Sequence, residues 1–328
     1  MGISLNPGVY APAPTRWASI GAGAELLGVS AVGGGGEPYR CSDDGQVVVG
    51  RWLPDVNTST PAMWGPTGAY TALPGPGTVS EANGVSADGT YVTGWSATSQ
   101  GRWLLRWNNG VLTQQFGPSF VSGPCSPAGN TAIGVVYLGG SAAALGRWSS
   151  AGGPNGSVQT LTQFPAMWTN IRNPTAMTPT ADAAAGIAYT TSNVYQGWVW
   201  RSGQFTDMGL PASAETMNVT GIRADGGLVT GNAYIPIQPN VFATRAEFWT
   251  PQTGWRLMAD WLAAQSIAFP GWTFESVNSI SPDGLTLAGQ GLSPLGQVRG
   301  YVITIPTPGG AAAVLALGLA GVRTRRRS

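Results

Sequence analysis

The sequence predicts an all-β fold: a single β-propeller of six blades, or alternatively seven, with about four short strands in each blade. Three observations predict it. Six segments share one turn motif with a glycine five residues further on, and a tryptophan follows five of those glycines. Glycine and proline, at 49 and 25 of 328 residues, supply many turns. The 14 Trp, 9 Tyr and 8 Phe supply large side chains for a core.

The turn motif reads Ser-x-Asp-Gly in its most regular form, at residues 86–89. Asp-Gly favours tight turns because glycine tolerates positive φ and aspartate bonds its own backbone. The later glycine predicts a close backbone approach or a bulge. The six motifs, each with its later glycine, are 42–45 with Gly50, 86–89 with Gly94, 126–129 with Gly134, 178–181 with Gly186, 223–226 with Gly231, and 281–284 with Gly289.

The recurring tryptophan is predicted to lie in the core of each blade. Its members are Trp17, Trp64, Trp107, Trp148, Trp200 and Trp249, and Val302 takes this place in the last unit. Eight tryptophans lie elsewhere: Trp52, Trp95, Trp103, Trp168, Trp198, Trp255, Trp261 and Trp272. Packing between blades is the favoured role for these eight. The alternative is a carbohydrate-binding face built by ring stacking.

The chain begins inside one repeat unit and ends after the third strand of another. The N-terminal half-unit could complete the last blade and close a six-bladed ring. Alternatively it is the second half of a seventh blade, and a longer N-terminus is expected upstream. One insertion, at residues 257–265, places its apolar side chains at helical spacing and is predicted as a short helix.

The repeats resemble the HAF repeat of exported bacterial proteins over residues 28–306. The similarity is strongest at residues 83–94 and again from residue 257 onward. The resemblance implies a surface or extracellular repeat protein, and it supplies no catalytic residues. Residues 1–306 are therefore predicted to form the propeller.

Residues 307–328 are predicted to be a separate tail. Pro306, Thr307 and Pro308 precede an apolar run at 311–322, predicted as a helix, and the chain ends in an arginine cluster. As a helix the run would be about 18 Å long, short against a bilayer core of about 30 Å. The basic residues of the cluster are Arg323, Arg325, Arg326 and Arg327.

This pattern resembles the PEP-CTERM sorting signal, with Thr307 where that signal has Glu. The resemblance implies export, transient membrane anchoring through the tail and processing by an exosortase-type membrane protease. The first 30 residues do not have the basic and apolar regions of a secretory signal peptide, so export requires a start upstream of the given sequence.

The composition argues against several classes of chemistry. The chain has no His, and all 16 basic residues are Arg, which removes the commonest general base and metal ligand. Five acids belong to the turns, and no local cluster of carboxylates is left for glycoside hydrolysis. Cys41 and Cys125 precede turn motifs and are predicted to be free and buried. We therefore predict no enzyme activity, no catalytic or metal-binding residues and no cofactor.

These features predict an exported surface or extracellular-matrix repeat protein with a structural, adhesive or binding role. Its expected partners are the exosortase-type protease, extracellular polysaccharide or other surface proteins, and the membrane only through the tail. The net charge of +1 argues against nucleic acid. Two alternatives stay open: a carbohydrate-binding or carbohydrate-cleaving propeller, and an intracellular interaction scaffold.

Overall fold

A computed structural model of the chain describes residues 2–5, 12–16, 25–28, 34–55, 57–139, 142–169, 171–191, 194–239 and 241–306. The described residues form antiparallel β-sheets and one short helix, α1 (Met258–Ala264). The all-β prediction and the predicted helical insertion are confirmed. The predicted C-terminal helix, the tail 307–328 and Trp17 lie outside the described residues. Within the described part, no helix has the length and apolar character needed to cross a membrane.

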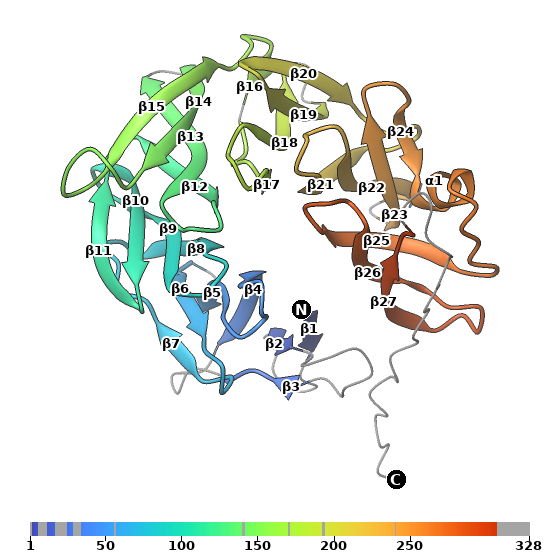
Figure 1. Cartoon of the computed structure of the whole chain (residues 1–328), viewed down its shortest axis with the longest axis horizontal. Helices are drawn as coiled ribbons and strands as arrows, with labels where there is room; N and C mark the ends of the chain where they lie inside the picture. Colours follow the sequence, from blue (N-terminus) through green and yellow to red (C-terminus); the bar gives the residue numbers. More distant parts are fainter. Residues whose placement is uncertain are drawn as a thin grey trace. The chain divides into compact units, whose positions relative to one another are not determined.

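Each of the six repeats forms one antiparallel sheet, and we number these sheets 1 to 6 along the chain (Figure 1). Sheet 1 contains β4 (Gly35–Cys41), β5 (Val48–Leu53), β6 (Thr60–Trp64) and β7 (Tyr70–Ala72), and sheet 2 contains β8 (Val79–Val85), β9 (Tyr91–Thr98), β10 (Gly101–Asn108) and β11 (Val111–Phe116). Sheet 3 contains β12 (Phe120–Cys125), β13 (Thr131–Gly139), β14 (Ala142–Ser149) and β15 (Ser157–Gln163).

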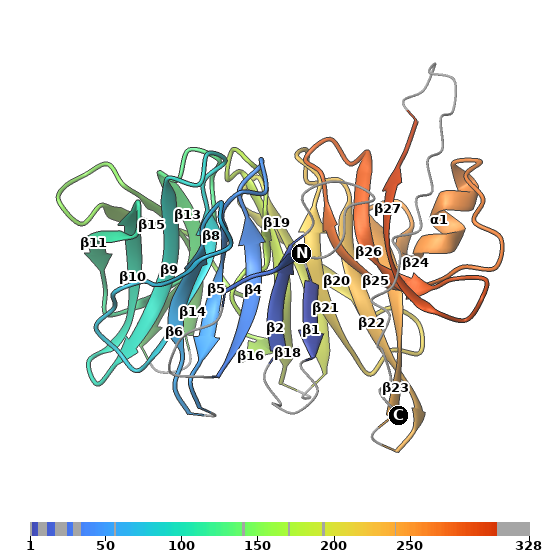
Figure 2. The same cartoon turned by 90° about the horizontal axis from the view of Figure 1, so that it is seen from below.

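Sheet 4 contains β16 (Trp168–Thr169), β17 (Ala176–Met177), β18 (Ala183–Thr190), β19 (Tyr195–Arg201) and β20 (Gln204–Gly209). Sheet 5 contains β21 (Thr216–Ile222), β22 (Val229–Gln238), β23 (Val241–Thr250) and β24 (Gly254–Leu257), and sheet 6 contains β25 (Thr273–Ile280), β26 (Thr286–Leu292) and β27 (Val298–Thr304). The β22–β23 hairpin of sheet 5 extends beyond its neighbouring strands (Figure 2).

The N-terminal strands β1 (Gly2–Leu5), β2 (Pro12–Arg16) and β3 (Glu25–Leu26) form a three-stranded sheet of their own. Sheet 6 has the order β25-β26-β27, and none of the N-terminal strands pairs with it among the described residues. The N-terminal half-unit therefore does not complete the last blade by strand pairing. The reason is local: β1 and β2 pair with each other in a hairpin, and β3 adds to β2.

The chain divides into two compact units. The first contains the N-terminal strands and sheets 1 to 3, and the second contains sheets 5 and 6 with α1, while the strands of sheet 4 are divided between them. In the first unit, the first strands β4, β8 and β12 of successive sheets contact one another. In the second unit, Met258 and Leu262 of α1 are buried in the core formed with sheets 5 and 6.

In five of the six repeats, the glycine five residues after the turn lies where two strands approach closely. A Cβ added to Gly94 would lie 2.0 Å from the carbonyl oxygen of Glu81 on the neighbouring first strand. The same contact recurs at Gly50, Gly134, Gly231 and Gly289, at 2.0 to 2.7 Å from a first-strand carbonyl oxygen. In sheets 1, 2, 5 and 6 a register shift in the first strand lies beside this contact. The predicted close approach and bulge are confirmed.

The recurring tryptophans form the cores of the sheets, as predicted. Trp64, Trp107 and Trp148 are fully buried, and Trp200 and Trp249 nearly so. The indole of Trp107 donates a hydrogen bond to the carbonyl oxygen of Pro74, 2.8 Å away, so the buried N–H is satisfied.

The assignment of Val302 to this position in the last unit is wrong. Each recurring tryptophan of sheets 1, 2, 3 and 5 pairs with the residue two before the repeat glycine, and in sheet 6 that partner, Leu287, pairs with Ile303. Ile303 is buried and Val302 is half-buried. The core position lies 13 residues after the repeat glycine in sheet 2, 14 in sheets 1, 3 and 6 and 18 in sheet 5, so counting 13 residues along the sequence selects the neighbour of Ile303.

The turn motifs are held by side-chain hydrogen bonds and joined to one another. In the second motif the Ser86 hydroxyl donates to the Asp88 carboxylate at 2.6 Å, which in turn accepts from the Thr90 backbone N–H. These bonds lower the pKa of Asp88, the serine hydroxyl contributing most. The backbone N–H of Ala87 donates to the carbonyl oxygen of Pro127 in the next turn, and two other neighbouring turns repeat this bond. The predicted structural role of the turns is confirmed.

We expect Gly94→Ala to destabilise the fold strongly, by about 3 kcal/mol or more, because the new methyl group collides with a backbone carbonyl that cannot move alone. Gly65→Ala is the matched control, since a Cβ there meets nothing within 4 Å. Urea unfolding of both variants measures the difference. Equal stability of the two variants would contradict the close approach.

Candidate functional site

Charged side chains gather in two places of the described structure, and the two differ in whether their charges are paired. One cluster lies on sheets 1 and 2, and the other lines a pocket at sheet 5. In the described residues no group of three or more acids or cysteines is placed to hold a metal ion.

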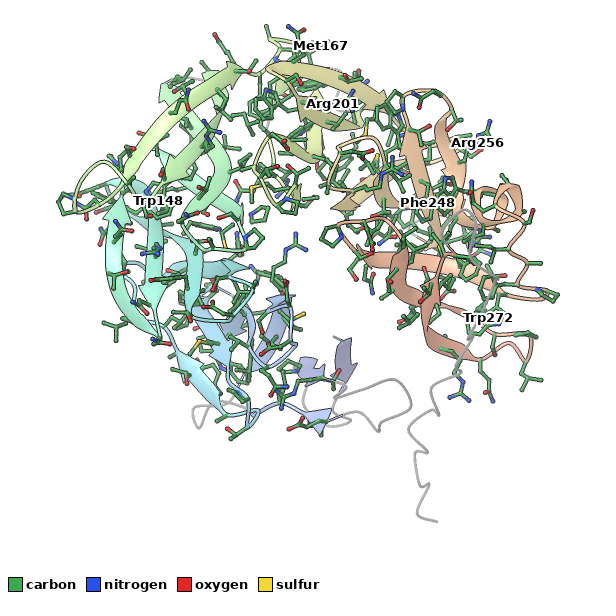
Figure 3. All side chains as sticks on the ribbon, in the orientation of Figure 1. Trp148, Met167, Arg201, Phe248, Arg256 and Trp272 are labelled. Atoms are coloured by element: carbon green, nitrogen blue, oxygen red, sulfur yellow. The ribbon has the colours of Figure 1, made fainter. Side chains whose placement is uncertain are left out.

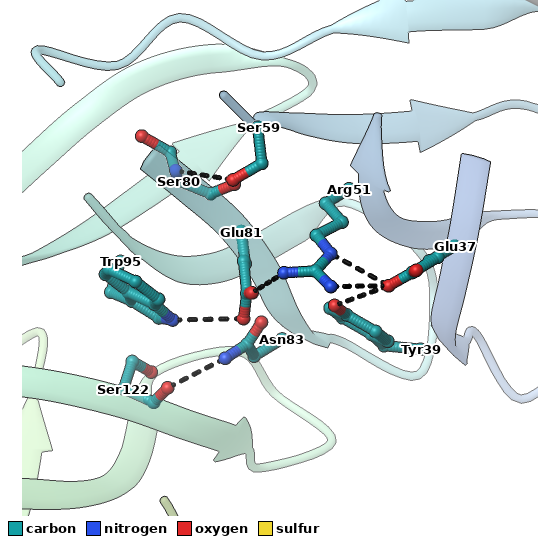
Figure 4. Close-up of polar contacts among 9 residues, drawn as sticks. All are labelled: Glu37, Tyr39, Arg51, Ser59, Ser80, Glu81, Asn83, Trp95 and Ser122. Atoms are coloured by element: carbon teal, nitrogen blue, oxygen red, sulfur yellow. Dashed lines mark hydrogen bonds and ion pairs between the residues drawn. The ribbon is translucent and has the colours of Figure 1, made fainter. Parts of the chain in front are cut away.

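The first cluster is a closed ion-pair network around Arg51 of β5 (Figure 4). Its guanidinium bonds the Glu37 carboxylate at 2.8 Å and the Glu81 carboxylate at 2.6 Å. The Trp95 indole donates to Glu81 at 3.2 Å, and the Tyr39 hydroxyl donates to Glu37. Burial raises the pKa of Tyr39 well above its usual value. Both carboxylates are compensated, so this network serves to join the first strands of sheets 1 and 2.

The network continues toward sheet 3. The Asn83 side-chain amide donates to the Ser122 carbonyl oxygen at 3.1 Å, and the Ser59 hydroxyl bonds the backbone of Ser80 (Figure 4). The Asn83 bond thus links the first strands β8 and β12, and the Ser59 bonds link the residue before β6 to β8, in addition to the bonds between turns. We assign this cluster a structural role.

The second cluster lines a pocket of about 560 Å³ at sheet 5. Its walls come from β22, β23, β24, the start of α1 and the segment before β21. The lining residues are Ala212, Ser213, Ile235, Arg245, Glu247, Trp255, Arg256, Leu257 and Asp260. Glu247, Arg245, Trp255 and Asp260 carry most of its chemistry, and we call this the Glu247 pocket.

In the other sheets whose strand register is defined, the residue at the position of Glu247 is uncharged. Glu247 pairs with the repeat glycine Gly231, and the equivalent partners are Ala62, Leu105, Gly146 and Tyr301. Only 5% of Glu247 is exposed, and its carboxyl has no hydrogen-bond or ion-pair partner among the described residues. An unpaired carboxyl at a core position costs stability, which packing alone does not explain.

The surroundings of Glu247 favour its protonated form. Loss of solvation on burial raises the pKa of Glu247 to about 7, and the Asp260 carboxylate adds to the rise. A carboxyl group that is half protonated at neutral pH can donate or accept a hydrogen bond. That property is typical of functional sites.

The remaining side chains of the pocket also have unused hydrogen-bonding capacity. The indole N–H of Trp255 is buried and has no partner, while its ring lies over Gly231. Arg245 shares the Glu247 side of β23, by strand alternation, and among the described residues it bonds only the Thr244 carbonyl oxygen. Arg256 pairs with Phe248 across β23 and β24 and so lies on the opposite face of this pair from Glu247, whose partner is Leu257; Figure 3 labels Arg256 and Phe248. Ion pairs in the described chain involve none of these pocket residues.

The pocket is therefore built as a binding site with donors, one aromatic wall and a protonatable acid. Folding brings Glu247 of β23 and Asp260 of α1, which form no local cluster in the sequence, to one pocket. The feature that marks Glu247 is that its carboxylate lies opposite a repeat glycine. This pairing can be recognised only when the strand register is known.

The structure places the other predicted residues as follows. Pro306 is the last described residue, and Thr307, Pro308 and the four tail arginines lie outside the described residues. Cys41 and Cys125 are free; Cys41 is exposed and Cys125 half-buried. The predicted burial of Cys41 is wrong, and Cys125 is only half-buried, because each is the last residue of an edge strand.

The eight additional tryptophans divide between packing and the pocket. Trp52, Trp95, Trp168 and Trp198 are buried, as packing predicts. Trp261 stacks on Phe248 with ring centroids 4.7 Å apart. Trp255 lines the Glu247 pocket and is the one of the eight that the structure places in a candidate site.

We expect the stability of the protein to fall as the pH rises from about 4.5 to about 7. The folded state keeps the Glu247 proton over this range and the unfolded chain releases it, so unfolding becomes easier with each step in pH. At about 1.4 kcal/mol per pKa unit, the loss amounts to roughly 3 kcal/mol at most. Glu247→Gln removes this component.

Urea unfolding of the wild type and Glu247→Gln at pH 5 and pH 8 measures the effect. The variant should gain stability relative to the wild type at pH 8. An identical pH dependence of the two proteins would show that Glu247 has an ordinary pKa.

Comparison with known proteins supports the fold. No protein-family model matches the sequence, and no curated protein is detectably similar to it. TolB from Acinetobacter baumannii is similar in structure, with a TM-score of 0.51 at 14% identity over 77% of this chain and 61% of that chain. This chain thus spans about three fifths of that TolB chain.

Two further similar structures have TM-scores below 0.5. Kuenenia stuttgartiensis hydrazine synthase is 14% identical over 82% of this chain and 76% of its own, with a TM-score of 0.48. The β-propeller domain of the Trilobed protease from Pyrococcus furiosus is 9% identical over 87% and 82%, with a TM-score of 0.47. The six repeat sheets and the likeness to TolB together assign the chain an all-β, six-bladed β-propeller fold with one helix.

Proposed function

We propose that this protein is an exported, surface-held binding propeller that takes a polysaccharide in the Glu247 pocket. One observation carries the proposal: the pocket gathers Arg245, Glu247 and Asp260 with no ion pair among the described residues, beside a buried, unpartnered indole N–H. Asp260 is exposed, but the Glu247 side chain and the Trp255 indole N–H are buried, and burying a polar group without a partner is costly.

Carbohydrate is the ligand class that the lining suits. Trp255 offers a ring face, and Ile235 and Leu257 add apolar area around the charged groups. Sugars present both apolar C–H faces and many hydroxyls, so a site of this mixed character matches them. A volume of about 560 Å³ lies within the usual range of small-molecule pockets.

Export is supported by the sequence. The HAF-like repeats and the PEP-CTERM-like tail favour a surface or matrix location, with the tail removed by an exosortase-type protease and the membrane contacted only through it. A surface location would bring the pocket into contact with extracellular polysaccharide. The propeller fold also suits a binding role, because its rigid sheets hold such a site in fixed geometry.

A second candidate function is carbohydrate cleavage. It is favoured by a carboxyl that keeps its proton near neutral pH beside a second carboxylate, the pairing that glycoside hydrolysis requires. Glu247 would be the general acid and Asp260 the base or nucleophile. Product analysis in the binding experiment below separates cleavage from simple binding.

The binding proposal is tested with a panel of immobilised polysaccharides and the full-length chain. We expect retention on at least one polysaccharide and a tenfold or greater loss with Arg245→Ala. Arg147→Ala is the control, because Arg147 bonds only Gln159 on sheet 3. Retention of both variants equal to wild type would contradict the assigned site. Release of reducing ends, abolished by Glu247→Gln, would favour cleavage.

The export proposal is tested by cell fractionation and intact mass in the native host. We expect the protein outside the cytoplasm, with the segment after about Pro308 removed. A full-length product confined to the cytoplasm would contradict export and favour an intracellular scaffold.

A further inference from the structure

We infer that the open edge of sheet 6 pairs with the same edge of a second copy of this chain, so that two chains form a dimer through β27. The inference goes beyond the proposed function, because it concerns assembly and uses no residue of the Glu247 pocket. Sheet 6 is one strand short. In sheets 1 to 5 the strand equivalent to β27 pairs with an outer strand, whereas β27 is the last strand of sheet 6 among the described residues.

The register of sheet 6 defines which backbone groups lie along this edge. β26 and β27 pair without a shift, and backbone N–H groups donate from Ile305 to Leu285 at one end and from Ser293 to Gln297 at the other, at 2.7 and 2.9 Å. Bonded and non-bonded pairs alternate in an antiparallel ladder. The residues that direct both N–H and C=O away from β26 are therefore Val298, Gly300, Val302 and Thr304.

The edge is accessible and its backbone groups are unused. Of the four outward residues, Val302 is half-buried and the other three are exposed. No backbone hydrogen bond from another described segment reaches them. The side chains of Tyr301 and Ile303 are buried in the core, so an added strand would change the backbone bonding of β27 and leave that core in place.

β27 also has none of the features that commonly keep an edge strand from pairing. It contains no proline and no bulge, and five of its seven residues are Val, Tyr, Ile or Thr, which favour strands. Exposed apolar side chains lie at its start: Val298 is 57% exposed, and Leu295 in the preceding hairpin is 82% exposed. An edge of this kind readily accepts another strand.

A second β27 in the antiparallel direction matches the edge. A two-fold axis at Tyr301 places Val298 opposite Thr304 of the second copy, and Gly300 opposite Val302. Every outward N–H and C=O of both strands then has a partner. Because the pairing uses both open edges, the assembly closes at two copies.

The charge of the strand favours the same register. Arg299 is the only charged residue of β27, and the axis at Tyr301 places it opposite the apolar Ile303 of the second copy. An axis at Arg299 would instead place two arginines opposite each other, which is unfavourable across a strand pair. It would also leave Thr304 without a strand partner.

The other segments of this chain suit the edge less well. Seven of the twelve residues at 311–322 are Ala or Gly, which strands disfavour. The N-terminal strands already form a sheet of their own. A second β27 supplies strand-favouring residues and a complete set of backbone partners, and we therefore assign the edge to it.

The test is analytical ultracentrifugation of the full-length chain from low to high micromolar concentration, with amide hydrogen exchange followed along β27. We expect a dimer at high concentration. The amides of the four outward residues should exchange tenfold or more slowly in the dimer than in the monomer. The amides of Arg299, Tyr301 and Ile303 should be protected in both states, because they bond β26.

Variants at the edge locate the interface. Val302→Pro removes an outward N–H and leaves the bonds to β26 in place, and Val302→Thr is the matched control that keeps the N–H. We expect a tenfold or greater loss of dimer affinity in the first and none in the second. Val298→Pro, at the first position of the strand, is a second disrupting variant if Val302→Pro lacks the thermal transition of the monomeric wild type.

Three results would overturn the inference. A monomer at every concentration with rapid exchange at the outward amides would show that the edge stays empty. A monomer in which those amides are protected would show that a segment of the same chain fills it. A dimer with unchanged affinity in the proline variants would place the interface elsewhere. Polysaccharide binding is measured separately, so failure of the dimer and failure of the proposed function are distinguishable.

Discussion

The close approach between the repeat glycine and a first-strand carbonyl oxygen is the constraint on which the rest of the structure depends. Where an added Cβ would lie 2.0 Å from that oxygen, only glycine lets the first two strands of a sheet meet. The approach fixes the register, and the register places a tryptophan or Ile303 in the core of each of the five sheets with a defined register. It also defines the residue opposite the glycine, which is where Glu247 lies in sheet 5.

The two clusters of charged side chains differ in their pairing: in one the charges form ion pairs within the chain, and in the other they do not. Arg51 compensates Glu37 and Glu81 and links neighbouring first strands, so removing Arg51 would leave two half-buried carboxylates without their ion-pair partner. Arg245, Glu247 and Asp260 share one pocket without pairing. Charged side chains that form no ion pair with one another are free to bind a ligand from outside the chain.

Much of the fold could be predicted because its signals are local. Asp-Gly turns, the glycine at a fixed offset and the recurring tryptophan all depend on short-range geometry, so they are visible in the sequence. Val302 was misplaced because the hairpin between the second and third strands differs in length among the sheets, and a strand reverses its face with each residue. Glu247 was missed because its significance depends on a partner sixteen residues earlier, at Gly231, which only the strand register identifies.

The central claim is that sheet 5 carries a carboxyl group kept in a pocket for a ligand, and the titration of Glu247 tests it most directly. Carbon-detected NMR of the side-chain carboxyl, assigned with Glu247→Gln, follows that titration from pH 4 to pH 9. The account predicts a midpoint of about 7 in the free protein and a different midpoint with a bound polysaccharide. A midpoint near 4.5 that does not change with any polysaccharide would contradict it.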